Sequence, residues 1–150
     1  MGDGLAASNV NRSYSLAATS IAIFTFTLVF LYPRFANGQI NALLFQVTLV
    51  VMGLATFSFV FATSYYYGSS LGSRIDDAKR TLYSRRGDRL WVLGYNLLLL
   101  SPSLILFSVG LFVVGAAWFA LWLMYLVFVI RFFPRVLTTP KSSGRDEAES

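Results

Sequence analysis

The sequence predicts an all-α membrane protein with four transmembrane helices, arranged as two antiparallel hairpins with a short amphipathic cytoplasmic helix between them. Its composition supports a membrane class, because 56% of its 150 residues are hydrophobic and only 13% are charged. The charges are absent from residues 13–33, 35–73 and 91–130. A charge at the bilayer centre costs about 2.5–3.5 kcal/mol on insertion scales, so uncharged stretches of this length predict spanning segments.

Two spans are predicted in the first half of the chain. A crossing takes about 20 apolar residues as a helix, and the first such segment covers about residues 15–32. Pro33 follows it and disfavours helix in the residue before it, so we expect this helix to end there. The segment is too long for a signal peptide, and we interpret it as retained. Asn37-Gly38 indicates a turn before the second span, at about residues 41–66.

The third apolar stretch, residues 91–130, is about twice too long for one crossing. Two sites compete for the turn that it requires. A turn at Pro102 would leave a first arm of about ten residues, which is too short to span a bilayer. A turn near residues 109–115, which Gly110 and Gly115 bound, leaves two arms of sufficient length. We therefore predict helices over about 91–109 and 114–133, with Pro102 as a kink.

The distribution of basic residues predicts the orientation. The middle loop, the tail and the N-terminus are all basic, and only Arg34 falls on the opposite side. Positive segments stay in the cytoplasm, so we expect residues 1–13 and the disordered tail 134–150 to be cytoplasmic, flanking a single transmembrane domain at 14–133. An even number of crossings must then separate loop from tail, which supports the fourth helix. We expect the protein in a bacterial inner (plasma) membrane.

The loop over residues 68–89 predicts a short amphipathic helix at about 74–84. Ser73 and Asp76 have the spacing of a capping box, and an apolar stripe follows at helical period. Topology alone explains the basic side chains, but they are also candidates for contact with anionic lipid head groups. These candidates are Arg74, Lys79, Arg80, Arg85, Arg86 and Arg89.

Small and polar residues recur three and four apart in the first three spans, which is typical of helix contacts in lipid. The stripes are Ala18, Ala22, Thr25, Val29 and Tyr32; Gln46, Leu49, Gly53, Thr56, Val60 and Thr63; and Asn96, Leu99, Ser103, Leu106 and Gly110. A packed helical bundle explains them. The alternative is that a polar path or ligand pocket is lined by Gln46, Asn96, Ser101 and Ser103.

The fourth span carries a stripe of aromatic residues instead. Trp118, Trp122 and Tyr125 lie at positions i, i+4 and i+7, on one helix face. We expect this face to contact lipid, because aromatic residues are well tolerated there. The alternative is a face on which a partner or a second copy docks.

The sequence predicts no enzyme and no cofactor or metal. Histidine and cysteine are absent, which removes imidazole and thiolate chemistry and the usual zinc and haem ligands. All seven acidic residues lie outside the spans, which argues against proton-coupled transport. Asp76-Asp77 alone is too little for a metal-dependent lipid transferase.

Two function classes remain. The first is a structural, accessory or regulatory membrane subunit that acts through helix–helix association, in a homo-oligomer or a larger membrane complex. The second is an oligomeric pore or small-solute carrier lined by the polar stripe residues. Besides the bilayer itself, we expect no nucleic acid among the partners.

Overall fold

The computed structural model describes residues 2–70 and 77–137. This part of the chain forms four helices, α1 (Gly2–Ala36), α2 (Ala42–Ser70), α3 (Asp77–Ser108) and α4 (Phe112–Leu137). Each of them contains a segment long and apolar enough to cross a membrane. The prediction of an all-α chain with four helices able to span a membrane is therefore confirmed.

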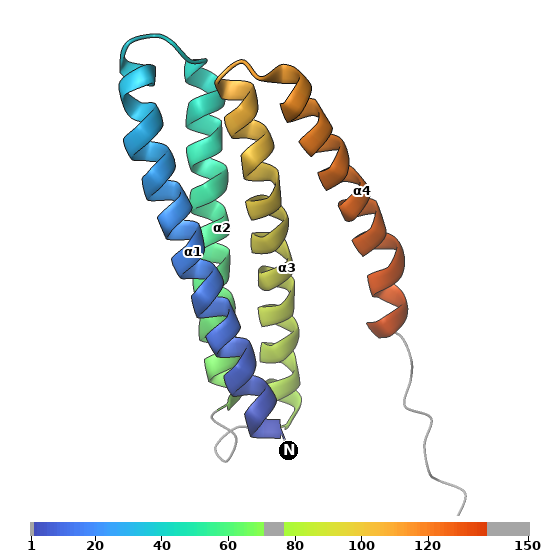
Figure 1. The fold of residues 1–150 in the computed structure, drawn as a ribbon. Helices are drawn as coiled ribbons and strands as arrows, with labels where there is room; N and C mark the ends of the chain where they lie inside the picture. The colour runs from blue at the N-terminus through green and yellow to red at the C-terminus, as the bar shows by residue number, and fades with distance from the viewer. Residues whose placement is uncertain (1, 71–76, 138–150) are drawn as a thin grey trace, which may run out of the picture.

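Consecutive helices run in opposite directions, so the connections at 37–41 and 109–111 share one end and the N-terminus lies at the other (Figure 1). α2 is central, since it packs along α1 and, more extensively, along α3. α4 packs principally on α3 and diverges from it toward the end where the N-terminus lies (Figure 1). The most extensive contact, between α2 and α3, thus joins the two predicted hairpins.

The predicted end of the first helix at Pro33 is wrong, because α1 continues through Pro33 to Ala36. Pro33 removes the one hydrogen bond that its own N–H would donate to the preceding turn, but the residues after it keep their donors and complete a last turn. The end is closed by backbone hydrogen bonds from Asn37 N to Pro33 O (3.1 Å) and from Gln39 N to Arg34 O (2.9 Å).

The predicted short amphipathic helix does not form a separate element. Residues 77–84 are the first turns of α3, which continues without a break to Ser108 and contains Pro102. The predicted capping residues, Ser73 and Asp76, lie outside the described residues. At the other end of α3, Gly110 adopts a φ of +84°, a left-handed conformation that favours glycine, and α4 begins two residues later.

Asn41 ties the start of α2 to the end of α3. Its side-chain Oδ1 accepts a hydrogen bond from Leu44 N (3.0 Å), which caps the helix, and its backbone N donates to Ser108 O (3.2 Å). The two connections at this end of the molecule are therefore held together by main-chain contact.

The core lies along one face of α2. Its buried residues include a series three and four apart, Phe45, Thr48, Met52, Ala55, Phe59, Ala62, Tyr66 and Ser69, with Ser58 and Thr63 beside it. The predicted stripe is displaced by one position toward the edge of this face: Gln46 is exposed, but Thr63 is buried and Thr56 shares a hydrogen bond with Ser20 of α1 (2.8 Å). The α1 stripe is also displaced, because the residues of α1 that are buried are Ser13, Ala17, Ser20 and Thr27.

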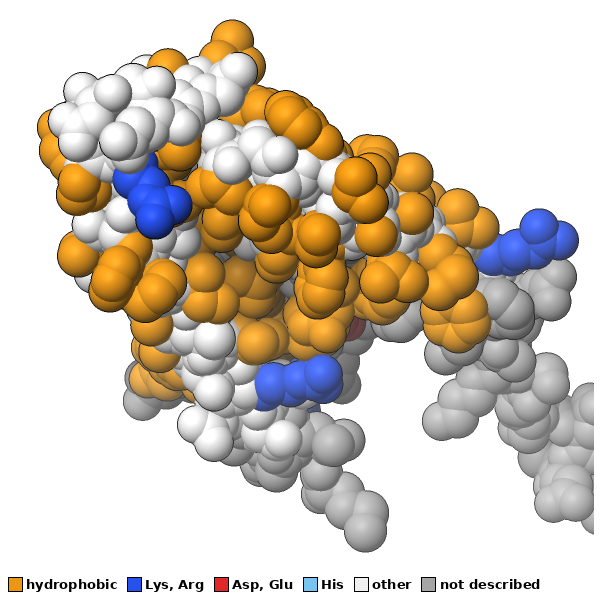
Figure 2. Space-filling view, turned by 45° about the horizontal axis from the view of Figure 1, so that its top comes forward, with side chains coloured by type: hydrophobic (Ala, Val, Ile, Leu, Met, Phe, Trp, Pro, Cys, Tyr) orange, Lys and Arg blue, Asp and Glu red, His pale blue; other side chains and the backbone are white. Residues whose placement is uncertain are grey.

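Hydrophobic side chains cover much of the face shown in Figure 2, and basic side chains are sparse on it. Many large apolar residues are exposed, for example Val29 and Phe57, each at 61%. A surface of this kind suits a hydrocarbon environment, since a soluble protein rarely exposes so large an apolar area.

Candidate functional site

The end of the helices that carries the N-terminus and the start of α3 is here called the basic end. The basic residues of α1 and α3 at this end are Arg12, Lys79, Arg80, Arg85, Arg86 and Arg89, and Arg131 lies toward the same end of α4. Of the predicted lipid-contact residues, Arg74 lies outside the described residues and the others occupy the first turns of α3. Lys79, Arg85, Arg86 and Arg89 are exposed. Their contact with anionic lipid stays a prediction.

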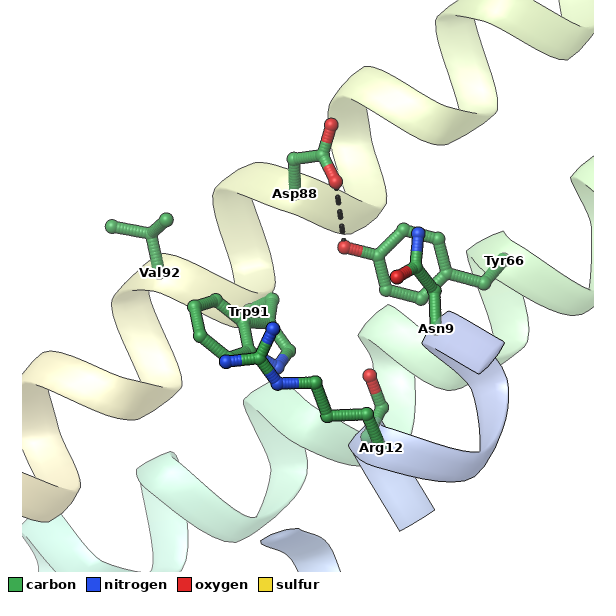
Figure 3. Close-up of a pocket in the computed structure, with 7 residues that line it drawn as sticks. Asn9, Arg12, Tyr66, Asp88, Trp91 and Val92 are labelled. Carbon is green, nitrogen blue, oxygen red and sulfur yellow. Dashed lines mark hydrogen bonds between the residues drawn. The ribbon is translucent and has the colours of Figure 1, made fainter. Parts of the chain in front are cut away.

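A cavity of about 270 Å³ lies at the basic end, between three helices (Figure 3). It is lined by Asn9, Arg12 and Ser13 of α1, Tyr66 of α2, and Asp88, Trp91 and Val92 of α3. Arg12 is the last charged residue before the first uncharged stretch, and Asp88 lies three residues before the last one begins. The cavity therefore sits where the helices change from charged to wholly apolar sequence.

Two contacts fix the polar groups of this cavity. The Tyr66 hydroxyl donates a hydrogen bond to Asp88 Oδ1 at 2.7 Å, which links α2 to α3. The guanidinium of Arg12 lies 4.5 Å from the ring centroid of Trp91, a cation–π contact between α1 and α3 (Figure 3). The Tyr66 ring in turn packs on Gly87, where a Cβ would come within 2.9 Å of Tyr66 Cε1.

Two side chains of opposite charge line this cavity but do not form an ion pair with each other. Arg12 and Asp88 form no ion pair within the described part of the chain, although both line the same space. Ser13 adds an unused polar group, because its side chain is fully buried and its Oγ has no hydrogen-bond partner in the protein. A buried hydroxyl without a partner is costly, so the site has unmet hydrogen-bonding capacity.

The predicted polar path residues do not gather at one place. Gln46 is exposed near the start of α2, at the opposite end from the cavity. Ser101 is buried and donates to Leu98 O within its own helix (2.8 Å), whereas Ser103 donates across to Gly115 O of α4 (2.9 Å). Asn96 donates to Val92 O at 2.8 Å, and its Oδ1 is buried without a partner.

The aromatic stripe of α4 faces α3 instead of pointing only outward. The indole N–H groups donate to main-chain oxygens of α3, from Trp118 to Leu99 O (3.2 Å) and from Trp122 to Asn96 O (3.0 Å). The Tyr125 ring lies 5.9 Å from that of Tyr95. The expected lipid-facing stripe is thus corrected to an α3-facing one, because an indole N–H buried in an apolar medium needs an acceptor. A partner at this face stays a prediction, and Trp118 is still 42% exposed.

Sequence reasoning missed the cavity because its members are spread over three helices. The signal present in the sequence was the position of Arg12, Asp88 and Trp91 beside the ends of uncharged stretches. Such residues are equally explained by topology and interfacial anchoring. Only the packing of α1, α2 and α3 brings them together.

Within the described residues, no group of three or more acidic, histidine or cysteine side chains is placed to hold a metal ion. Comparisons of the chain with protein-family models, with curated proteins and with solved structures found no match. The residues and their geometry are therefore the basis for inferring function.

Proposed function

We propose that the protein is an accessory or regulatory subunit of a plasma-membrane complex, without enzymatic activity, and that α4 is the helix that binds its partner. One observation carries this proposal: in the 18-residue apolar window of each helix, 33% of α2 is buried but only 6% of α4. Helices in lipid associate through close packing and hydrogen bonds, and α4 leaves most of its surface available for such contacts.

The attachment of α4 to the rest of the chain is concentrated on one side. Ser103 of α3 donates to Gly115 O of α4, and Trp118 and Trp122 of α4 donate to main-chain oxygens of α3, so all three hydrogen bonds lie on the side that α3 covers. The remaining surface is apolar and open, as at Val113 (84% exposed) and Met124 (67%). A helix from another membrane protein can pack there without disturbing the α3 contact.

The hydrogen bonding of the polar stripe residues favours this role over a pore or carrier. A lumen needs polar groups that are free to contact water or a solute. Ser101, Ser103 and the Asn96 amide are already donors to main-chain oxygens, and Thr63 and Ser58 bond the carbonyls four residues before them. Such side chains are ordinary constituents of packed membrane helices.

We further propose that the basic end faces the cytoplasm and that its exposed arginines contact anionic head groups. The support is the clustering of basic residues at this end, while Arg34 is the basic residue of the opposite connection. Reporter fusions at Gly38 and after Ser150 test the orientation, because the two sites should report opposite sides of the membrane.

Site-specific photocrosslinking in native membranes tests the role of α4. A photoreactive amino acid is placed at Val113 or Met124 on α4, and at the equally exposed Phe26 (61%) of α1 as the matched control. We expect a discrete protein adduct from the α4 positions, reproducible at native expression, and only lipid adducts from Phe26.

Adducts that are equally abundant from α1 and α4, or lipid adducts alone at all three positions, would contradict the proposal. A liposome efflux assay with the purified protein addresses the alternative. Solute release that disappears in Asn96→Leu would favour the pore.

A further inference from the structure

We propose that the cavity between Arg12, Ser13, Tyr66, Asp88 and Trp91 binds a zwitterionic group that joins a phosphate to a primary ammonium, as in an ethanolamine phospholipid. This inference is independent of the role of α4. It rests on two features of the described residues: Arg12 and Asp88 line the cavity with opposite charges but form no ion pair with each other, and the buried Ser13 hydroxyl has no hydrogen-bond partner among them.

The phosphate fits the α1 side of the cavity. The Arg12 guanidinium lies over the Trp91 ring, with Cζ 4.5 Å from the ring centroid, and a guanidinium carries its N–H donors around the edge of its plane. Such a fork binds phosphate oxygens in pairs. Ser13 follows directly in α1 and lines the same cavity; rotation of its side chain into the cavity would let Oγ, which is buried as it stands, donate to a third phosphate oxygen and satisfy the hydroxyl.

The ammonium fits the α3 side. Asp88 Oδ1 accepts the hydrogen bond from the Tyr66 hydroxyl, and among the residues drawn in Figure 3 no hydrogen bond reaches Oδ2 of this exposed carboxylate. A carboxylate oxygen in this position accepts a charge-assisted hydrogen bond from a primary ammonium. The Tyr66 hydrogen bond holds the carboxylate in place, so the ligand need not order it.

The presence of one positive and one negative side chain in the cavity disfavours ligands that carry only one sign of charge. An anion would face the Asp88 carboxylate, and a cation would face the Arg12 guanidinium, so either would leave one charge opposed. A zwitterion satisfies both. The place of the cavity, at the end of the apolar segments, is also where phospholipid head groups lie, with acyl chains running along the exposed apolar surface.

Native mass spectrometry of the full-length protein in detergent micelles tests the proposal. The protein is titrated with dioleoyl phospholipids that carry ethanolamine, choline or glycerol head groups. We expect the ethanolamine lipid to bind about tenfold more tightly than the choline lipid, because a trimethylammonium group has no N–H to donate to Asp88. Equal or tighter binding of the choline lipid or of the glycerol lipid would overturn the proposal. Tighter binding of the anionic glycerol lipid would indicate simple attraction to basic residues.

Variants assign the effect to the cavity. Asp88→Asn keeps an oxygen that accepts from Tyr66, so the fold is retained, and it should abolish the preference for ethanolamine over choline. Ser13→Ala removes a hydroxyl without a protein partner, so it should weaken lipid binding severalfold without lowering stability. Arg34→Ala is the matched control, since Arg34 is an exposed arginine in the last turn of α1, at the opposite end from the cavity, and does not line it.

Soluble O-phosphoethanolamine, added as a competitor, distinguishes the two sources of this chemistry. Displacement of the ethanolamine lipid means that the zwitterion alone is recognised, and retention of the lipid means that its acyl chains are also required. Both results support the site. An ethanolamine preference that persists in Asp88→Asn, or that falls equally in Arg34→Ala, would overturn it.

Discussion

The three helices α1, α2 and α3 differ from α4 in how they are held. α2 buries one continuous face, whose residues are spaced alternately three and four apart and include Phe45, Met52 and Phe59. α3 approaches this face so closely that a Cβ added at Gly94 would lie 3.1 Å from Ala55 O. α4 has one buried residue in its described apolar segment, Gly115, and is joined to α3 by hydrogen bonds to main-chain oxygens.

This difference shows that apolar character and packing are separate properties in a membrane. α4 is the most apolar of the four spans by mean hydropathy (2.3) and is the least buried, with α2 at 2.1 the most buried. Lipid is as apolar as leucine, so hydrophobicity drives a helix into the bilayer but not onto its neighbour. What distinguishes α2 is that it packs along two helices, α1 and α3, whereas α4 packs principally on α3.

The largest effect is expected for Phe59→Ala in the core of α2. Phe59 is fully buried, so truncation leaves a cavity, and we expect a loss of about 3–5 kcal/mol in the free energy of unfolding. Phe57→Ala is the matched control, because Phe57 is 61% exposed and should change stability by only about 0.5 kcal/mol. Unfolding in mixed micelles, followed by circular dichroism, measures both. Equal losses would break the contrast between packed and lipid-facing surface.

A smaller loss is expected for Gly94→Leu at the contact of α2 and α3. Its side chain would collide with Ala55 O, Ser58 Cβ and Phe59 Cδ1, all 3.1–3.2 Å from the added Cβ, at a cost of about 1–3 kcal/mol. Gly53→Leu is the control, since nothing lies within 4 Å of a Cβ there. The same unfolding assay measures both variants. Equal stability of Gly94→Leu and Gly53→Leu would contradict a close contact between α2 and α3 at Gly94.

Trp122→Phe should act mainly on α4. It removes the indole hydrogen bond to Asn96 O, which is worth about 0.6–1.7 kcal/mol between membrane helices. Spin labels at Leu93 of α3 and Val127 of α4, both exposed, should report a broader distance distribution in the variant. A matched pair at Leu93 and Phe61 of α2 should be unchanged. Broadening of both pairs would mean that α4 is not attached separately.

The smallest effect is expected for Ser103→Ala, which loses one hydrogen bond from α3 to Gly115 O, at about 0.6 kcal/mol. Ser64→Ala is the control, because the exposed Ser64 bonds only Val60 O of its own helix. We expect the unfolding free energy of Ser64→Ala to match that of the unmodified protein. If Ser103→Ala were instead as damaging as Phe59→Ala, α4 would belong to the core.

How far the sequence could go is clearest in the helix stripes. Small residues three and four apart were correctly recognised as a feature of these helices, but the faces were misplaced: Ala18 and Val29 of α1 are exposed, and Ala17 and Ser20 are buried. In a helix that is apolar all round, several adjacent faces carry such a spacing, and no polar face marks the outside. The third stripe is right in part, because the Ser103 side chain donates to α4; Asn96 contacts α4 only through its main-chain oxygen, which accepts from Trp122.

The candidate site was out of reach for the same reason. Arg12, Tyr66 and Asp88 are each ordinary boundary residues in sequence, and their separation along the chain gives no sign that they line one space. A cavity depends on which faces of α1, α2 and α3 meet, and that was the property the sequence left open.

The sequence by itself determined that the chain is helical, apolar enough to cross a membrane four times, and basic at one end, because the cost of burying charge and backbone acts on each segment separately. The tertiary structure decided which faces pack, that α4 stands apart from α2, and that opposite charges from α1 and α3 face one cavity. These follow from the fit of side chains between helices, which no single segment contains.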